Sequence, residues 1–380
     1  MNGSTRSLEI ALALIDEGYT VDMITATRIG QVDFPSKYMG ITIHWVDTPY
    51  GNELGFYSRV KMFLVYAFYS SYYSLIKDYD LIYCSSTPLT IGIPALLARF
   101  FRKKKFVFEV RDCWPEIPIA MRVIERKWII LFLKRFAYWC YSNSSLIVAL
   151  SIDMKYTILE SYNISTDKVL VAENGSRSQN FVKDRNHDKA LKKKYNLPNQ
   201  CKIVIYPGAL GRVNAAHYIA HLAEFFNEEL CFLVIGSGSE KQKVRCVAES
   251  NLSLNKNLFI LDPISKKDIF ALINLSDFLI STVDDIPELS QNSANKFFDG
   301  LRSGKCVLIN YGGWQQEFLE STESGIRLSR DLNVASTQLR TLLNDESRLE
   351  YLKRNAVKHS SRYETSNITK RIVNRINELL

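Results

Sequence analysis

Residues 277–309 read DFLISTVDDIPELSQNSANKFFDGLRSGKCVLI. The apolar runs Asp277–Ser281 and Lys305–Ile309 have the length and composition of buried strands. Between them, Asn295–Ser303 has the pattern of a helix that ends at Gly304. A strand, a helix and a second strand in this order form a βαβ unit, which places both strands in a parallel sheet. The stretch therefore predicts an α/β fold.

The same alternation of short apolar strands and longer helical segments runs through the whole chain. The strands expected before residue 200 are Thr20–Thr25, Ile41–Val46, Asp80–Ser85, Lys105–Val110, Ser145–Leu150 and Lys168–Val171. Those expected after it are Cys201–Tyr206, Cys231–Ile235, Leu258–Leu261, Asp277–Ser281 and Lys305–Ile309. Two such arrays in tandem predict two Rossmann-like, doubly wound domains.

Four segments follow from this pattern. Residues 1–175 form the first array and residues 201–362 the second, and the polar stretch 176–200 is expected to link them. Residues 363–380 have the pattern of an amphipathic helix. Its apolar face consists of Ile368, Ile372, Ile376 and Leu379. This face must be buried, and packing on the first domain is one way to achieve that.

The start of the chain is unusual for a doubly wound domain. The first expected helix, Ser4–Glu17, begins before any strand, and only Gly3-Ser4-Thr5 resembles the usual glycine turn. The first strand of this domain is therefore expected to be missing. We favour a truncated start over a permuted domain.

The composition is that of a globular protein, with 380 residues, of which 47% are hydrophobic and 23% charged. No run of about 18 apolar residues predicts a membrane-spanning helix, and no secretory signal is visible. The 7 cysteines form no CxxC pair, which favours the cytoplasm, without a disulfide framework or zinc site. His217 and His221 have the spacing of a metal-binding pair, but lack a third ligand nearby, and we expect no metal.

Positive charge is concentrated in one part of the first array. Between Arg99 and Arg135 there are 11 Lys and Arg residues and 4 Asp and Glu residues, within a net charge of +8 for the chain. The stretch also holds aromatic residues, among them Phe100, Phe101, Trp128 and Phe132. Such a patch is typical of proteins that bind the headgroups of an anionic membrane. A nucleic-acid surface is less favoured because no reading motif is present, and a solvated basic helix face is the remaining alternative.

Glycine turns follow two successive strands of the second array. Gly208 and Gly211 follow the first strand, and Gly236 and Ser237 follow the next. Glycine lets the backbone approach a phosphate, and Arg212 beside the first turn can neutralise a diphosphate. Either turn alone is a weak signal, because it also suits a tight strand-to-helix connection. Two turns at neighbouring strand ends favour a ligand crevice.

The segment from Asn292 to Val307 adds a helix at the same edge. A polar loop enters this helix at the carboxyl end of a strand, where open α/β sheets bind ligands. The first turn of the helix offers N–H groups to an anion, and Asp299 can bind the two hydroxyls of a ribose. We expect Asn295, Phe297 and Asp299 at the ligand. The alternative is that Asn295 caps the helix and Asp299 is solvated.

The strand Lys105–Val110 runs into a dense cluster of charge. Residues 108–116 read FEVRDCWPE, so Arg111, Asp112 and Glu116 follow the strand at the edge where ligands bind. A purely structural ion pair between Arg111 and Asp112 is the alternative. The tripeptide Glu173-Asn174-Gly175 closes the first array near the expected crevice.

These segments together resemble the family-four retaining glycosyltransferases of bacterial surface-polysaccharide assembly, especially those similar to N-acetyl-L-fucosamine transferases. The resemblance covers nearly the whole chain. It is carried by Ser85–Thr90 (SSTPLT), FEVRDCWPE, Glu173–Gly175, Gly236–Gly238 and Asn292–Trp314 with its NYGGW ending. It implies a GT-B fold, in which two Rossmann-like domains face a central cleft. The C-terminal domain would hold the donor and the N-terminal domain the acceptor.

The resemblance also implies roles for single residues. Many members carry a Glu-x7-Glu motif, in which the first glutamate faces the donor sugar and the second binds the ribose. The corresponding positions here are Gln291 and Asp299. Arg212 is the candidate for the diphosphate-binding arginine, and Lys296 would replace the usual lysine. Arg111 and Asp112 would lie near the acceptor or the sugar hydroxyls. The other residues implied at the acceptor or cleft are Gly3, Ser4, Trp114, Glu116 and Asn174.

The implied reaction moves a sugar from a nucleoside diphosphate donor, expected to be UDP-linked, to a polyprenyl-diphosphate-linked acceptor, with retention at the anomeric carbon. The product would belong to O-antigen or capsule synthesis. Arg212, Lys296 and the glycine-turn amides would stabilise the leaving diphosphate, so no metal or cofactor is expected. The enzyme would work in the cytoplasm, at the inner face of the plasma membrane, without nucleic acid. Alternatives are a sugar-nucleotide 2-epimerase of the same architecture and a degenerate, non-catalytic relative.

Overall fold

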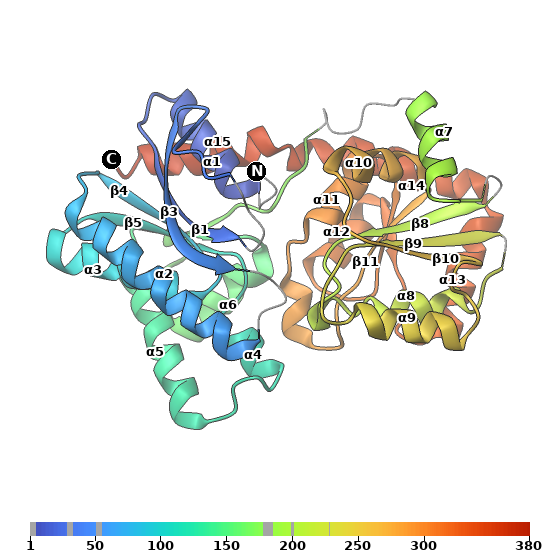
Figure 1. Cartoon of the computed structure of the whole chain (residues 1–380), viewed down its shortest axis with the longest axis horizontal. Coiled ribbons are helices and arrows are strands. Elements are labelled where there is room, and N and C mark those ends of the chain that lie inside the picture. Colours follow the sequence, from blue (N-terminus) through green and yellow to red (C-terminus); the bar gives the residue numbers. More distant parts are fainter. Residues whose placement is uncertain (1–4, 29–32, 51–54, 178–184, 199–200, 228) are drawn as a thin grey trace. The chain divides into compact units, whose positions relative to one another are not determined.

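The alternating strands and helices divide into two α/β units in the computed structural model (Figure 1). The structure describes residues 5–28, 33–50, 55–177, 185–198, 201–227 and 229–380. Unit 1 comprises Met1–Glu173, Gln291–Ser293 and Thr365–Leu380, and unit 2 comprises Asn174–Ser290 and Ala294–Glu364. The prediction of an α/β fold with two Rossmann-like units is confirmed.

Unit 2 contains one parallel sheet of six strands in the order β10-β9-β8-β11-β12-β13. Its strands are β8 (Lys202–Pro207), β9 (Leu230–Ile235), β10 (Leu258–Leu261), β11 (Phe278–Ser281), β12 (Cys306–Ile309) and β13 (Gly325–Arg327). The strand order reverses between β8 and β11, the point where doubly wound sheets bind ligands beyond their carboxyl ends. The helices of the unit are α7 (Arg185–Lys194), α8 (His217–Ala223), α9 (Lys241–Ser250), α10 (Lys266–Leu275), α11 (Asn295–Arg302), α12 (Trp314–Thr322), α13 (Leu332–Asn344) and α14 (Glu346–Ser360).

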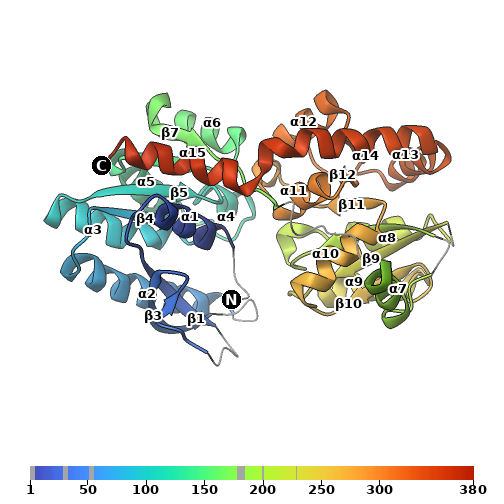
Figure 2. The ribbon, with the colours of Figure 1, turned by 90° about the horizontal axis from the view of Figure 1, so that it is seen from above.

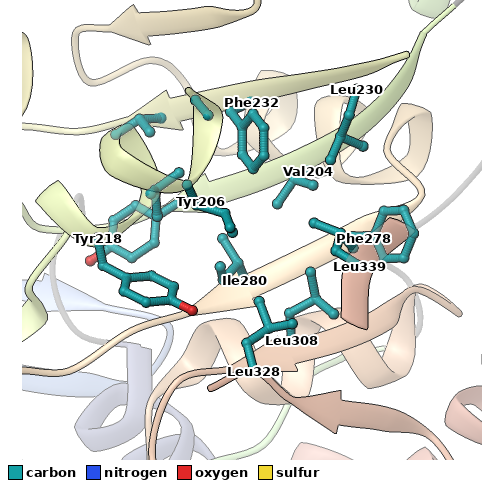
Figure 3. Packing of buried hydrophobic residues seen from close by; sticks show 14 of the residues in the cluster. Val204, Tyr206, Tyr218, Leu230, Phe232, Phe278, Ile280, Leu308, Leu328 and Leu339 are labelled. Carbon is teal, nitrogen blue, oxygen red and sulfur yellow. The ribbon is translucent and has the colours of Figure 1, made fainter. Parts of the chain in front are cut away.

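Both faces of this sheet are covered by helices, because successive side chains of each strand point to opposite faces. Val204, Phe278 and Ile280 join a core with apolar residues of α8, α9, α13 and α14 (Figure 3). Ile203 and Leu279, one position along, join a second core with residues of α7 and α10. The near-continuous apolar strands of the sequence are therefore explained by burial on two sides.

The stretch 176–200, which we expected to be a linker, contains α7 and contributes to the core of unit 2. Leu191 and Leu197 are buried beside Ile203. The many lysines of α7 hid this short apolar face in the sequence. The sequence predicted no disulfide framework, and it did not predict the single disulfide between Cys201 and Cys231, whose Cα atoms lie 6.1 Å apart. Their separation of 30 residues carries no signal in the sequence.

Unit 1 contains two sheets instead of one continuous sheet. The first has the order β1-β3-β2, with β1 (Asp22–Arg28) and β3 (Ile41–Tyr50) parallel and β2 (Lys37–Tyr38) antiparallel to β3. The second is parallel, in the order β4 (Leu81–Ser85), β5 (Lys105–Val110), β6 (Leu146–Ala149) and β7 (Val169–Val171). Among the described residues, β1 and β4 each have one unpaired edge. A continuous doubly wound sheet would have a parallel strand between them.

Tyr66 contacts β1, and the nearby Cys84 of β4 influences its hydroxyl. It projects from α2 (Phe56–Ile76), and its hydroxyl donates to the carbonyl of Ile24 in β1 at 2.9 Å. Burial and, to a lesser extent, the neighbouring Cys84 of β4 raise the pKa of the Tyr66 hydroxyl. One buried phenol thus satisfies a carbonyl of an edge strand that has no strand partner on that side.

The helices of unit 1 lie on both sides of the four-stranded sheet. They are α1 (Thr5–Asp16), α2, α3 (Gly92–Arg102), α4 (Glu116–Ala120), α5 (Lys127–Asn143), α6 (Ile152–Tyr162) and α15 (Thr365–Asn377). Ile368, Ile372 and Ile376 of α15 are buried, and α15 packs on α1 (Figure 2). Arg371 of the same helix forms an ion pair with Glu173 at 2.8 Å. No helix in the described part of the chain is long and apolar enough to cross a membrane.

Candidate functional site

The two glycine turns of unit 2 pack directly on each other. The N–H of Gly208 donates to the carbonyl of Ile235 at 2.9 Å, and the N–H of Leu210 donates to that of Ser237 at 2.9 Å. Gly236 has a φ of 155°, and a Cβ atom there would lie 1.9 Å from the carbonyl oxygen of Gly208. Only glycine allows this approach. The predicted turns therefore form one structure at the carboxyl ends of β8 and β9.

Lys296 brings its ammonium group to this structure from the first turn of α11. A Cβ atom at Gly208 would lie 3.3 Å from the Lys296 Nζ, which itself lies 3.9 Å from the centre of the Tyr206 ring. Lys296 is only 8% exposed, and burial lowers its pKa to about 7. Among the described residues, no carboxylate lies within ion-pair distance of this group. A buried cation without a counter-ion, next to exposed backbone turns, is suited to an anionic ligand.

Asp299 lies three residues after Lys296 and therefore on the same side of α11. Its carboxylate accepts a hydrogen bond from Ser176 at 2.6 Å. Burial raises the pKa of Asp299 to about 6, against the opposing effects of Ser176 and Lys266. The residue as a whole is partly exposed, and a carboxylate has acceptor capacity beyond the single bond from Ser176.

The other residues predicted for the donor differ in their surroundings. Arg212 is exposed just after Gly211 and forms no ion pair with any residue that the structure describes. Ser237 and Asn295 are also exposed, in the second glycine turn and at the start of α11. Phe297 is fully buried against Phe298, Trp314 and Phe318, so its side chain anchors α11 in the core.

Gln291 belongs to unit 1, although the chain on either side of Gln291–Ser293 belongs to unit 2. Its side-chain carbonyl accepts hydrogen bonds from Thr157 at 3.0 Å and from Cys113 at 3.4 Å. Its backbone carbonyl accepts one from Ser151 at 2.7 Å. The predicted sugar-facing residue therefore lies against the FEVRDCWPE segment.

The polar residues of the FEVRDCWPE segment interact with different neighbouring residues. Burial raises the pKa of Asp112 to about 6, although Arg111 and a hydrogen bond with Thr87 oppose the shift. Glu116 accepts a hydrogen bond from Tyr162 at 2.6 Å, and its second oxygen is buried without a partner among the described residues. Arg111 and Trp114 are partly exposed, and the side chain of Asn174 is buried. Gly3 and Ser4 lie outside the described residues.

Residues 3–177 match the family model described as Glycosyltransferase Family 4. This match covers somewhat less than half of the chain, so the N-terminal part of the chain is similar to that family. The matched residues include FEVRDCWPE and Glu173-Asn174-Gly175. The sequence matches none of the curated proteins with which it was compared.

Solved structures extend the likeness to the whole chain. HepE of Anabaena, in complex with UDP and glucose, has a TM-score of 0.74 and 14% identity, covering 100% of this chain and 97% of its own. Sucrose-phosphate synthase of Thermosynechococcus elongatus has a TM-score of 0.79 and 12% identity, and the match covers 99% of this chain and 94% of the synthase. WaaG, a glycosyltransferase involved in lipopolysaccharide biosynthesis, has a TM-score of 0.72 and 12% identity. The match covers 98% of this chain and 95% of WaaG. At these identities the likeness shows a GT-B glycosyltransferase fold.

The sequence patterns did not predict a buried network in unit 1. Arg6, in the first turn of α1, forms an ion pair with Glu109 at 2.7 Å and donates to the carbonyl of Glu173 at 2.6 Å. Tyr83 and Ser85 also donate to Glu109, at 2.7 and 2.5 Å. Burial alone would raise the pKa of Glu109, but Arg6 and these hydrogen bonds hold it below its usual value. A glutamate inside the apolar strand KFVFEV was the one available signal, and it did not identify Arg6.

Proposed function

We propose that the protein is a retaining glycosyltransferase that moves a sugar from a nucleoside diphosphate donor to a lipid-linked glycan acceptor. The observation that carries the proposal is the buried ammonium group of Lys296, which has no counter-ion among the described residues and lies beside the Gly208 turn. This group lies at the point of strand reversal in unit 2, the usual ligand position of such sheets. Asp299, one turn away on the same helix, supplies an acceptor for the ribose hydroxyls.

The distribution of charge suits the departure of a diphosphate. As the bond between the anomeric carbon and the diphosphate oxygen breaks, negative charge grows on that oxygen. Lys296, Arg212 and the turn amides stabilise this charge, so the proposed reaction uses no metal. The acceptor hydroxyl oxygen forms the new bond to the anomeric carbon on the same face, and its proton passes to the leaving phosphate oxygen.

The proposed classes of donor and acceptor rest on the chemistry of the site residues and on the similarity to solved structures. HepE is described with UDP and glucose, and a UDP-sugar is our proposed donor, with an amino-deoxysugar as its sugar. WaaG is described as acting in lipopolysaccharide biosynthesis, which supports a polyprenyl-diphosphate-linked acceptor of O-antigen or capsule synthesis. Nucleotide-sugar donors place the reaction at the cytoplasmic face of the plasma membrane. The acidic groups Asp112 and Glu116 are the proposed acceptor contacts.

The test is an incubation of the purified protein with UDP-sugars, with and without an isoprenyl-diphosphate-linked acceptor. Release of UDP that depends on the acceptor, and that is lost in Lys296→Met, is the expected result. A changed donor sugar without UDP release would replace the proposal with an epimerase. Absence of both reactions, together with no UDP binding by calorimetry, would contradict both enzymes and favour a non-catalytic relative.

A further inference from the structure

Helix α2 of unit 1 buries small and polar residues and exposes large apolar ones, which is the reverse of the usual pattern for a helix in a globular protein. The side that packs toward α3 contains small residues, and Ala67, Ser70, Ser71 and Ser74 are all buried there. The buried serines satisfy their hydroxyls with backbone carbonyls, and Ser74 donates to the carbonyl of Pro94 in α3 at 3.1 Å. The opposite side carries large apolar residues: Tyr57 (87% exposed), Leu64 (53%), Phe68 (71%), Tyr72 (57%) and Ile76 (54%).

Two neighbouring helices extend this exposed apolar face. α3 packs on both α2 and α5, and all three lie on the same side of the four-stranded sheet (Figures 1 and 2). Phe100 and Phe101 at the end of α3 are exposed, as are Trp128, Leu131 and Phe132 along one side of α5. A soluble surface seldom exposes so many large apolar side chains on adjacent helices, and such patches mark interaction sites.

The charges of these helices all have the same sign. α2, α3 and α5 together contain seven basic residues, Arg59, Lys61, Arg99, Arg102, Lys127, Lys134 and Arg135, and no Asp or Glu. Aromatic side chains surrounded by Lys and Arg suit the boundary between lipid headgroups and acyl chains, where the rings enter the boundary and the cations meet phosphates. The charge also opposes a symmetric dimer, because a two-fold axis would place this basic face against itself.

We propose that the outer face of α2, α3 and α5 is a docking surface for an anionic lipid bilayer, and that α2 supplies its main apolar contacts. The surface is argued from side chains of unit 1 alone and goes beyond the sugar transfer proposed above. It adds α2 to the basic stretch between Arg99 and Arg135 that the sequence singled out. Phe68 and Tyr72 lie in the middle of α2 and are its expected central contacts.

The experiment is flotation of the full chain with vesicles that contain neither acceptor nor nucleotide, so its result is independent of enzymatic activity. Vesicles of phosphatidylglycerol and phosphatidylcholine in equal parts should bind the protein on the order of tenfold more tightly than pure phosphatidylcholine, and added salt should weaken binding. The double variant Phe68→Ser/Tyr72→Ser should reduce binding by about tenfold or more. Leu131→Ser/Phe132→Ser in α5 should also reduce it.

The matched control is Leu252→Asn in unit 2. Leu252 is 79% exposed and has a φ of 58°, a conformation that Asn tolerates, so this change removes an exposed apolar side chain away from the proposed surface. All substituted residues are exposed, so the thermal unfolding profiles should match the wild type. The proposal is overturned if the α2 and α5 variants bind vesicles as well as the wild type, or if both vesicle types bind equally. It is also overturned if the wild type ignores vesicles and instead forms a dimer, or a complex with a protein, that the α2 variant disrupts.

Discussion

Replacing Lys296 with Met should stabilise unit 2 in the absence of ligand. The pKa of this buried amine is lowered to about 7 from an ordinary value of 10.5. Since one pKa unit corresponds to about 1.4 kcal/mol, holding the charge in this place costs up to about 5 kcal/mol. Met has a similar shape without the charge, but it loses the contact with the Tyr206 ring, which contributes about 0.5–2 kcal/mol. Allowing for solvent relaxation, we expect a net gain of about 1–3 kcal/mol at neutral pH.

The gain should depend on pH in a defined direction. In the folded wild type Lys296 releases its proton near pH 7, whereas in the unfolded chain it keeps the proton up to about pH 10.5. The unfolded state therefore binds more protons between these values, and the wild type gains stability as pH rises through this window. The variant has no such gain. Its advantage should shrink by about 2 kcal/mol between about pH 7 and pH 9.

The same substitution should weaken UDP binding by about 10- to 100-fold, because a hydrogen bond from a charged group to phosphate contributes about 1.5–3 kcal/mol. Calorimetry measures the affinity. Hydrogen exchange of peptides from β8 and β9, followed through a urea series, measures the stability of unit 2 alone. Lys305→Met is the matched control, because Lys305 is also 8% exposed but donates to the carbonyl of Asn274 at 2.8 Å. Its UDP affinity should equal that of the wild type.

The reasoning is refuted if Lys296→Met destabilises unit 2 and leaves UDP affinity unchanged, since Lys296 would then be a structural residue. It is also refuted if the stability of the variant and of the wild type changes in parallel between pH 7 and pH 9. Increased stability together with reduced affinity is expected only where a charge is kept for a ligand at a cost to the free protein.

Three further predictions test other parts of the structure. Asp299→Asn should weaken the binding of UDP by about tenfold and remove any preference for UDP over its 2′,3′-dideoxy analogue in calorimetry. If the preference is preserved, the ribose binds elsewhere. Gly236→Ala should destabilise unit 2 by about 3 kcal/mol in urea unfolding, because the new Cβ would meet the Gly208 carbonyl; wild-type stability would contradict the close packing of the turns. Glu109→Gln should destabilise unit 1 by about 3–5 kcal/mol by leaving Arg6 buried without a counter-charge, and Arg6→Met/Glu109→Leu should recover much of the loss; equal losses in both variants would show that the ion pair is not the cause.

Five of the six strands of unit 2 could be predicted because they are rich in apolar residues, whereas the short edge strand β13 was not predicted. The expected strand Cys231–Ile235 and the observed β9 differ by one residue at the start, and the glycine turns lie where they were expected. The pattern failed where apolar residues were few. α7 has a basic, polar sequence, and its burial depends on Leu191 and on Leu197 just beyond it. Periodicity does not detect a helix that is held by so few contacts.

At the candidate site, prediction from the sequence is limited for a different reason. Helix α11 both packs in the core and carries the candidate ligand-binding residues. Phe297 and Phe298 bury one side of α11, while Lys296 and Asp299 occupy the other, and the sequence places all four within a single turn. The spacing of these residues along the helix is enough to assign them to its two sides. It cannot show that Lys296 lies over Tyr206, since that contact requires β8 and β11 to be neighbours in the sheet. The reversal of strand order makes neighbours of segments about 70 residues apart, and it brings a buried lysine to the place where we propose that the nucleotide binds.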